Sequence, residues 1–181
     1  MKLDLHYEID IPEGVEVEII DKGNMTVKGP KGTNTRTFKD ALVKFKVEDR
    51  KVILDVPKAT KREKSRIITY TKHIHNMING TTEGFTYKLK VCSGHFPMAA
   101  TVSNNQFTIK NFIGEKCPRT IPIKEGADVK VDGDTITVES VNKEICGQVA
   151  ADIESLTRIR DKDRRIFQDG IYIIEKNGKA I

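Results

Sequence analysis

Five cationic side chains fall within eight positions near the end of the chain and form its clearest candidate for chemistry. They are Arg158, Arg160, Lys162, Arg164 and Arg165. A guanidinium group can bridge two phosphate oxygens, so this segment could contact several successive phosphates of a nucleic acid. Phe167, Gly170 and Tyr172 follow, and would add a stacking ring, a position of close backbone approach and a phenolic donor. A solvated charged loop is the alternative, and the neighbouring rings favour RNA binding over it.

Two other basic sequences could face an anion. The turn Gly29-Pro30-Lys31-Gly32 could aim Lys31 at a phosphate, but it lacks the P-loop spacing, so an ordinary turn between strands is favoured. The second is a basic run at the start of a predicted helix, where cations oppose the helix dipole. It comprises Lys58, Lys61, Arg62, Lys64 and Arg66. A solvated helix face is the favoured interpretation of this run, and it is the second choice for an RNA contact.

Residues for catalysis or metal binding are sparse. His73 and His75 point to different sides of a helix, and Cys92 with His95 lacks a second ligand pair at zinc spacing. Asp132 and Asp134 flank a glycine in a predicted hairpin turn, where acidic residues are common for conformational reasons. We therefore predict no catalytic site, no metal site and no cofactor.

Composition describes a highly charged chain with a modest core. Its 181 residues carry a net charge of +5, with 31% charged and 38% hydrophobic residues. The basic surplus is uneven, since residues 31–90 hold fifteen Lys or Arg and six Asp or Glu. Three widely spaced cysteines argue against a disulfide framework, and no signal peptide or apolar run of membrane-spanning length is apparent. We expect a cytoplasmic protein that does not contact a membrane.

An internal repeat indicates a tandem duplication. Residues 24–32 resemble residues 106–114, with Thr26 and Thr108 separated by 82 positions, and a second match pairs residues 47–54 with 131–138. The predicted domains are residues 1–83 and 84–181, with the junction between residues 83 and 95. Because duplicated scaffolds often divide labour, function should be sought where the copies differ.

Hydrophobic periodicity predicts an α+β fold in which each copy is a small antiparallel sheet packed by one helix. A capping box from Thr60 to Glu63 begins the first helix, and Asn79-Gly80 is expected to end it. The second helix is predicted over residues 143–157, and the charged segment follows it without counterpart in the first copy. Strands are predicted at 15–19, 25–28, 33–38, 43–47, 52–56, 85–92, 99–103, 107–110, 120–123, 129–131 and 135–139.

Over essentially its full length the chain resembles the universal large-subunit ribosomal protein family called "L six", in its archaeal and eukaryotic form. The runs that carry the resemblance are Gly147 to Glu154, Thr157 to Arg160, Asp163 to Ile173 and Val27 to Gly32. The resemblance implies two copies of one α+β fold and a place near the stalk base and the sarcin-ricin loop. It also implies that the second domain makes most of the ribosomal RNA contacts.

The predicted function is therefore that of a non-enzymatic component of cytoplasmic ribosomes, with large-subunit rRNA and neighbouring proteins near the stalk base as partners. The predicted rRNA-binding residues are Arg158, Arg160, Lys162, Arg164, Arg165, Phe167, Gly170, Tyr172, Lys176 and Lys179. The alternative is a tandem-repeat DNA-binding protein of the TATA-box-binding kind, which inserts phenylalanine wedges from both repeats. This alternative is weak because the candidate wedges have no counterparts at the repeat offset; they are Phe85, Phe96, Phe112 and Phe167.

Overall fold

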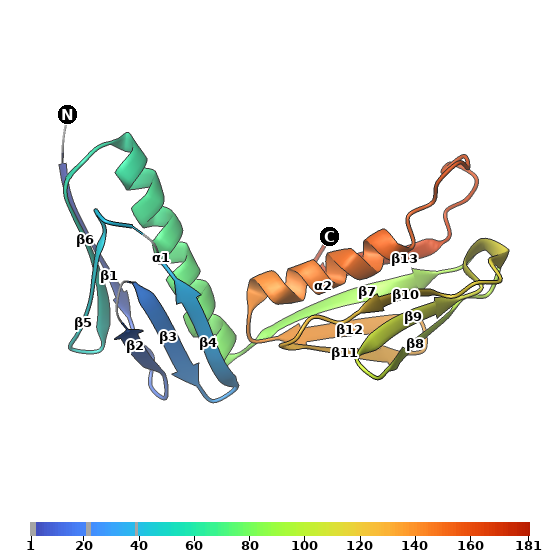
Figure 1. Ribbon diagram of the computed structural model, residues 1–181, viewed down its shortest axis with the longest axis horizontal. Coiled ribbons are helices and arrows are strands. Elements are labelled where there is room, and N and C mark those ends of the chain that lie inside the picture. The colour runs from blue at the N-terminus through green and yellow to red at the C-terminus, as the bar shows by residue number, and fades with distance from the viewer. Residues whose placement is uncertain (1–2, 21–22, 39) are drawn as a thin grey trace. The chain divides into compact units, whose positions relative to one another are not determined.

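The computed structural model describes residues 3–20, 23–38 and 40–181 (Figure 1). The chain divides into two compact units, Met1–Gly84 and Phe85–Ile181. The division falls one residue beyond the boundary placed from the sequence, and the strand that follows it belongs entirely to the second unit. Each unit has its own hydrophobic core, centred on residues such as Val52 and Ile74 in the first and Leu89 and Ile153 in the second.

The described residues of the first unit form two antiparallel sheets and one helix, which confirms the predicted α+β class. Its strands divide between two sheets instead of forming the one expected. The first sheet has the order β2-β3-β4, formed by Glu16–Ile20, Asn24–Gly29 and Gly32–Thr37. The second has the order β1-β6-β5, formed by Leu3–Asp10, Lys51–Ala59 and Lys44–Glu48.

Strand β1 was not predicted from the sequence, although its residues alternate between apolar and charged or polar types. Ile9 is buried, Leu5 and Tyr7 are half-buried, and the residues between them are exposed. This is the period-two pattern of a strand with one buried face. It pairs antiparallel with β6, and the register places Tyr7 opposite Leu54.

The helix α1 spans Lys61–Thr82 and begins with the predicted capping box between Thr60 and Glu63. The carboxylate of Glu63 accepts hydrogen bonds from the hydroxyl and amide of Thr60, and these bonds lower its pKa to about 2. The predicted end at Asn79-Gly80 is wrong. Gly80 lies inside the helix, and the glycine with positive φ that follows the last turn is Gly84. The helix therefore runs to the end of the unit.

The second unit repeats this plan and extends it. Three strands form the order β10-β9-β8, namely Arg119–Pro122, Gln106–Lys110 and Ala99–Ser103, and a short 3-10 turn η1 at Phe112–Gly114 follows β9. Five strands form the order β11-β12-β7-β13-β14, namely Ala127–Asp132, Thr135–Ser140, Phe85–Cys92, Gly170–Lys176 and Lys179–Ala180. The helix α2, Lys143–Leu156, packs against this sheet.

The extension begins after α2, where the chain makes a long loop and returns as β13. This strand pairs antiparallel with β7, with Gly170 opposite Cys92 and Tyr172 opposite Lys90. Figure 1 shows the loop projecting beyond the end of α2. Among the described helices, none is long and apolar enough to span a membrane.

Candidate nucleic-acid interface

The loop between α2 and β13 carries the predicted basic cluster on an anchored backbone. Ile159 is buried in the core of the unit, whereas Arg158 and Arg160 on either side are exposed. Lys162, Arg164 and Arg165 are exposed as well. Because Ile159 is held in the core, the backbone at the start of the loop is fixed and the neighbouring cations point to solvent.

The loop cations differ in their partners. Arg165 is paired with Asp163, with 2.7 Å between Nη2 and Oδ2, and this bond lowers the pKa of the carboxyl. Within the described ranges, Arg158, Arg160 and Arg164 have no acidic partner. These three guanidinium groups are the ones left to bind an external anion.

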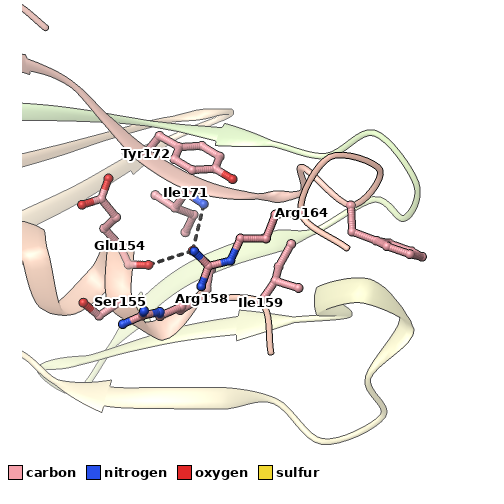
Figure 2. Close-up of a pocket in the computed structure, with 9 residues that line it drawn as sticks. Glu154, Ser155, Arg158, Ile159, Arg164, Ile171 and Tyr172 are labelled. Carbon is pink, nitrogen blue, oxygen red and sulfur yellow. Dashed lines mark hydrogen bonds between the residues drawn. The ribbon is translucent and has the colours of Figure 1, made fainter. Parts of the chain in front are cut away.

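Two of the unpaired arginines line a pocket at the C-terminal end of α2. The pocket has a volume of about 280 Å³ and is lined by Glu154, Ser155, Thr157, Arg158, Ile159, Arg164, Phe167, Ile171 and Tyr172. In Figure 2, Arg164 extends from the loop toward the end of α2, with Tyr172 on one side and Arg158 on the other. Two guanidinium groups beside a phenol suit a phosphate with part of its nucleotide.

Hydrogen bonds between backbone groups and side chains fix the residues at the base of this pocket. The Thr157 hydroxyl accepts a hydrogen bond from the Ile171 amide at 2.9 Å and donates to the Glu154 carbonyl at 3.1 Å. The Glu154 carboxylate accepts from the Ile173 amide at 3.2 Å. Thr157 and Glu154 thus hold the start of β13 against α2, and the one acidic side chain of the pocket already accepts a backbone hydrogen bond.

Gly170 lets the ring of Tyr172 pack closely on the backbone at the start of β13. It is buried, and an added Cβ would lie 3.2 Å from atoms of the Tyr172 ring. The close approach that this glycine permits in the structure is therefore to a ring of its own chain. Tyr172 remains 44% exposed, and its hydroxyl donates to the Gln168 carbonyl at 3.1 Å. The missing side chain of Gly170 seats the ring at the pocket.

Phe167 is half-buried, and its ring already has neighbours. The His95 ring stacks on it with centroids 5.0 Å apart, and the Lys162 ammonium lies 4.8 Å from its centroid. This arrangement stabilises Lys162 by a cation–π contact and leaves Phe167 less free to stack on a base than the sequence suggested. Tyr172 is the more accessible ring.

A buried carboxylate that the sequence analysis missed fixes the base of the loop. Asp169 is 2% exposed and accepts hydrogen bonds from the Gly94 amide at 2.5 Å and the His95 amide at 3.2 Å. Burial opposes its ionisation, but these amides and the His95 ring together lower its pKa. The sequence signal was an acidic residue directly before the glycine that begins β13.

Asp169 also connects the basic loop to the segment after β7. A second hollow of about 620 Å³ lies there, lined by Cys92, Ser93, Gly94, His95, Ile166, Gln168, Asp169 and Tyr172. Tyr172 lines both this hollow and the arginine pocket. The candidate interface therefore extends from α2 across Tyr172 to the loop that contains His95.

The predicted lysines at the end of the chain lie elsewhere. Lys176 ends β13 and Lys179 faces it from β14, opposite the end of β13 that meets the loop. A strand of this length spans about 20 Å. Both side chains are exposed, but the structure does not bring them together with Arg158 and Arg164.

The loop at Gly29 to Gly32 is a structural turn that joins β3 to β4. The Lys31 amide donates to the Thr81 carbonyl at 3.0 Å, and its ammonium donates to the Glu83 carbonyl. A Cβ on Gly29 would lie 2.7 Å from the Thr81 oxygen. The glycine lets the turn pack on the end of α1, and Lys31 is used there. In the described parts of the chain, no group of three or more potential ligands could hold a metal ion.

The family model described as ribosomal protein L6 matches the chain twice, over residues 11–84 and 96–170. The chain belongs to the ribosomal protein L6 family. The double match agrees with the internal repeat and with two units of one fold.

Relatives from archaea support the membership in the L6 family over nearly the whole chain. It is 44% identical to large ribosomal subunit protein uL6 of Methanobrevibacter smithii, over 93% of this chain and 94% of that protein. It is 43% identical to the uL6 protein of Methanococcus vannielii, over 96% and 95% respectively. With the uL6 protein of Methanosarcina mazei the identity is 44%, over 93% and 95%.

The extent of the L6 family match divides the predicted site residues. The second match ends at Gly170, so it contains the whole loop from Arg158 to Asp169. Tyr172, Lys176 and Lys179 lie beyond it. Position in the fold and in the family match thus agree in separating the two terminal lysines from the loop.

Proposed function

We propose that this chain is a structural, non-enzymatic component of the large ribosomal subunit in the cytoplasm, where its second unit binds large-subunit rRNA. Its relatives are named as large ribosomal subunit proteins, and the family resemblance favours a place near the sarcin-ricin loop and the stalk base. Neighbouring ribosomal proteins at the stalk base would be further partners. The DNA-bending alternative loses its support because two candidate wedges, Phe85 and Phe112, are buried.

The observation that carries the proposal is the arginine pocket. Arg158 and Arg164 lack acidic partners in the described structure and line one hollow with Tyr172. A phosphate held between the guanidinium groups would leave its ribose or base near the phenol, a combination typical of RNA recognition. Arg160 and Lys162 would contact phosphates further along the backbone, and Arg165 would contribute less because of its pair with Asp163.

A matched pair of variants tests this assignment. We expect Arg164→Ala to weaken binding to an rRNA fragment that contains the sarcin-ricin loop and to reduce the slope of log affinity against log salt by about 0.7 to 0.9, one phosphate contact. Arg165→Ala, next to it in the chain but paired with Asp163, should change both quantities less. Filter binding or fluorescence anisotropy over a salt series measures both.

The control is the same fragment without the sarcin-ricin loop, together with circular dichroism to show that the fold is retained. Equal losses for Arg164→Ala and Arg165→Ala would contradict the role given to the pocket. Unchanged affinity for both would contradict the role of the whole loop. Cross-linking of Tyr172 to RNA in intact large subunits would locate the contacted nucleotides.

A further inference from the structure

Strand β1 of the first unit has an open outer edge at the position where β13 covers the second unit. Among the described residues β1 is the outermost strand of the order β1-β6-β5, whereas β7 lies between β12 and β13. The two strands occupy equivalent positions, because each is the first strand of its unit and pairs antiparallel with the strand before the helix. Tyr7 faces Leu54 and Ile9 faces Val52, as Tyr87 faces Val138 and Leu89 faces Ile136.

The backbone of β1 presents hydrogen-bonding groups along this edge. The Ile11 amide donates to the Arg50 carbonyl at 2.9 Å, and the register continues from there without a break to Leu5. In an antiparallel pair the alternate residues point their backbone groups away from the partner. His6, Glu8 and Asp10 therefore direct their amides and carbonyls to the open edge.

The equivalent groups of β7 are used by β13. The Val91 amide donates to the Asp134 carbonyl, directly before β12, so the residues alternating with Val91 direct their backbone groups away from β12. These residues are Lys88, Lys90 and Cys92, and they pair with Glu175, Tyr172 and Gly170 of β13. The second copy thus shows that an antiparallel strand fits at this position of the fold.

The apolar face near the open edge is incompletely covered. Leu5 and Tyr7 are half-buried, whereas the corresponding Phe85 and Tyr87 are 4% and 8% exposed. In the second unit β13 brings Ile171 and Ile173 to the core beside this row. An added strand with apolar residues at alternate positions would extend the core of the first unit in the same way.

Charge on the other face identifies the kind of strand. In the second unit Lys88 of β7 pairs with Glu175 of β13 at 3.0 Å. At the equivalent position β1 carries Glu8, and Asp10 stands where β7 has Lys90. Lys51 of β6 reaches Glu8 at 2.8 Å and Asp10 at 3.9 Å, and His6 lies 3.1 Å from Glu8. His6 is shared with Asp55 of β6 at 2.6 Å, so three carboxylates on this face share two basic side chains. Pairing β1 with β1 of a second copy would bring these like charges together, which is unfavourable.

We propose that the outer edge of β1 binds an extended segment of another polypeptide as an antiparallel strand. The segment alternates apolar residues, which lie over Leu5 and Tyr7, with lysine or arginine residues, which face Glu8 and Asp10. This interaction goes beyond rRNA binding and uses the unit that lacks the arginine loop. It is a β-strand addition whose backbone bonds give affinity and whose charges give selectivity.

A short acetylated and amidated peptide of alternating lysine and valine is the probe, added to the full chain. We expect the amides of His6, Glu8 and Asp10 to exchange rapidly with solvent in the free protein, since they face the open edge. At nine-tenths occupancy by the peptide their exchange should slow by about tenfold, while those of Leu5, Tyr7 and Ile9 stay slow in both states. Hydrogen exchange measured by NMR resolves these residues individually.

Two variants at one position separate the backbone from the charge. Glu8→Pro removes an edge amide without losing a bond to β6 and should abolish peptide binding, because proline at an edge blocks strand addition. Glu8→Ala removes only the carboxylate and should weaken binding several-fold. Neither should change binding to the rRNA fragment, which separates this proposal from the function proposed for the second unit.

Slow exchange of His6, Glu8 and Asp10 in the free protein at low concentration would overturn the proposal, as would unchanged exchange in excess peptide. Protection that rises with protein concentration alone would indicate self-pairing and contradict it. Equal binding of a glutamate–valine peptide would contradict the assigned charge. If Glu8→Pro does not fold, a lysine–valine peptide with N-methylated backbone replaces it, and tight binding of that peptide would exclude a strand.

Discussion

The two units share strand order and helix position, yet the chain takes a different course after the helix of each. In the first unit α1 has 22 residues and leads to the end of the unit, while in the second α2 has 14 residues and leads into the basic loop and β13. The loop can carry unpaired charge because the core of its unit is closed by the sheets, by α2 and by the anchors Ile159 and Asp169. The comparison teaches that the second unit differs from the first by a basic loop and a strand that follow the repeated frame.

Charge count and charge availability give different rankings of the units. By number the first unit has the slightly larger basic surplus, with sixteen Lys or Arg and thirteen Asp or Glu against fifteen and thirteen in the second. Several of its cations are paired, however, such as Lys28 with Glu18 and Arg66 with Asp40. Within its described residues the exposed cations of α1 without an acidic partner are Lys61, Arg62, Lys64 and Lys72. Those in the first turn oppose the helix dipole. The outer face of α1 is therefore the strongest alternative to the basic loop as a surface for RNA binding.

The largest expected effect comes from removing two cations from each unit in turn. We expect Arg158→Ala with Arg164→Ala to reduce affinity for the rRNA fragment by on the order of a hundredfold, because both guanidinium groups line the pocket. Lys61→Ala with Arg62→Ala removes the same formal charge from α1 and should reduce affinity by about fivefold or less. Anisotropy titrations at one fixed salt concentration compare the two.

A larger loss of rRNA affinity in the α1 double variant would indicate that the first unit, and not the second, makes the main contacts with RNA. Equal losses would show that the binding depends on total charge and not on the pocket. In either case the thermal stability of both double variants should remain near that of the parent, because all four side chains are exposed.

A smaller effect is expected on the stability of the first unit when Gly29 is replaced by alanine. The new Cβ would lie 2.7 Å from the Thr81 oxygen and 2.8 Å from the Thr81 Cβ, so the turn must move away from α1. We expect a loss of about 2 kcal/mol in the free energy of unfolding of that unit. Hydrogen exchange of core amides in each unit measures the two stabilities separately.

Gly147 in α2 provides the control for this substitution. A Cβ there meets the Tyr87 ring at 3.6 Å, an ordinary contact. Gly147→Ala should stabilise the second unit by about 0.5 to 1 kcal/mol, because glycine is unfavourable within a helix. A higher free energy of unfolding for Gly29→Ala, or a lower one for Gly147→Ala, would contradict the packing that the structure gives these two glycines.

The smallest expected effect concerns the carboxylate that fixes the basic loop. Because the pKa of Asp169 is lowered on folding, its ionised form stabilises the second unit above the ordinary value of 3.8, and this contribution is lost as the pH falls through the lower folded value. Asp169→Asn keeps one acceptor oxygen but not the charge. We expect a loss of about 1 kcal/mol at neutral pH that disappears in acid.

The measurement is the free energy of unfolding of the second unit from neutral pH down to acid, for the parent and for Asp169→Asn. The first unit of the same molecule is the internal control, since it should not respond to the substitution. A difference between the two proteins that stays constant with pH would show that the carboxylate contributes by its shape and not by its charge.

Periodicity and capping were sufficient to predict most elements of the fold. The capping box at Thr60 and Glu63 and the apolar stripe that contains Ile67 and Ile74 define α1 locally, and the family match confirms the α+β class. The missed strand β1 had a readable pattern, but its partner β6 lies more than forty residues away in the sequence. The end of α1 was misplaced because Gly80 tolerates a helical conformation and only the path beyond Thr82 uses Gly84 to stop it.

The candidate site was predictable in its residue types and not in its geometry. The density of arginines from Arg158 to Arg165 is visible in the sequence, as is the pair of rings after it. The stacking of Phe167 on His95 and the hydrogen bonds from the Gly94 and His95 amides to Asp169 depend on β13 returning beside β7. Residues separated by more than seventy positions meet there, which no local pattern encodes.

The sequence by itself determined two copies of an alternating pattern, the helix starts, the position of the cationic segment and the family. Only the tertiary structure decided which cations remain available, separating Arg164 from the neighbouring Arg165 and the loop from Lys176 and Lys179. The reason is physical, because charge is a property of each residue, whereas pairing and burial depend on the path that brings distant segments into contact.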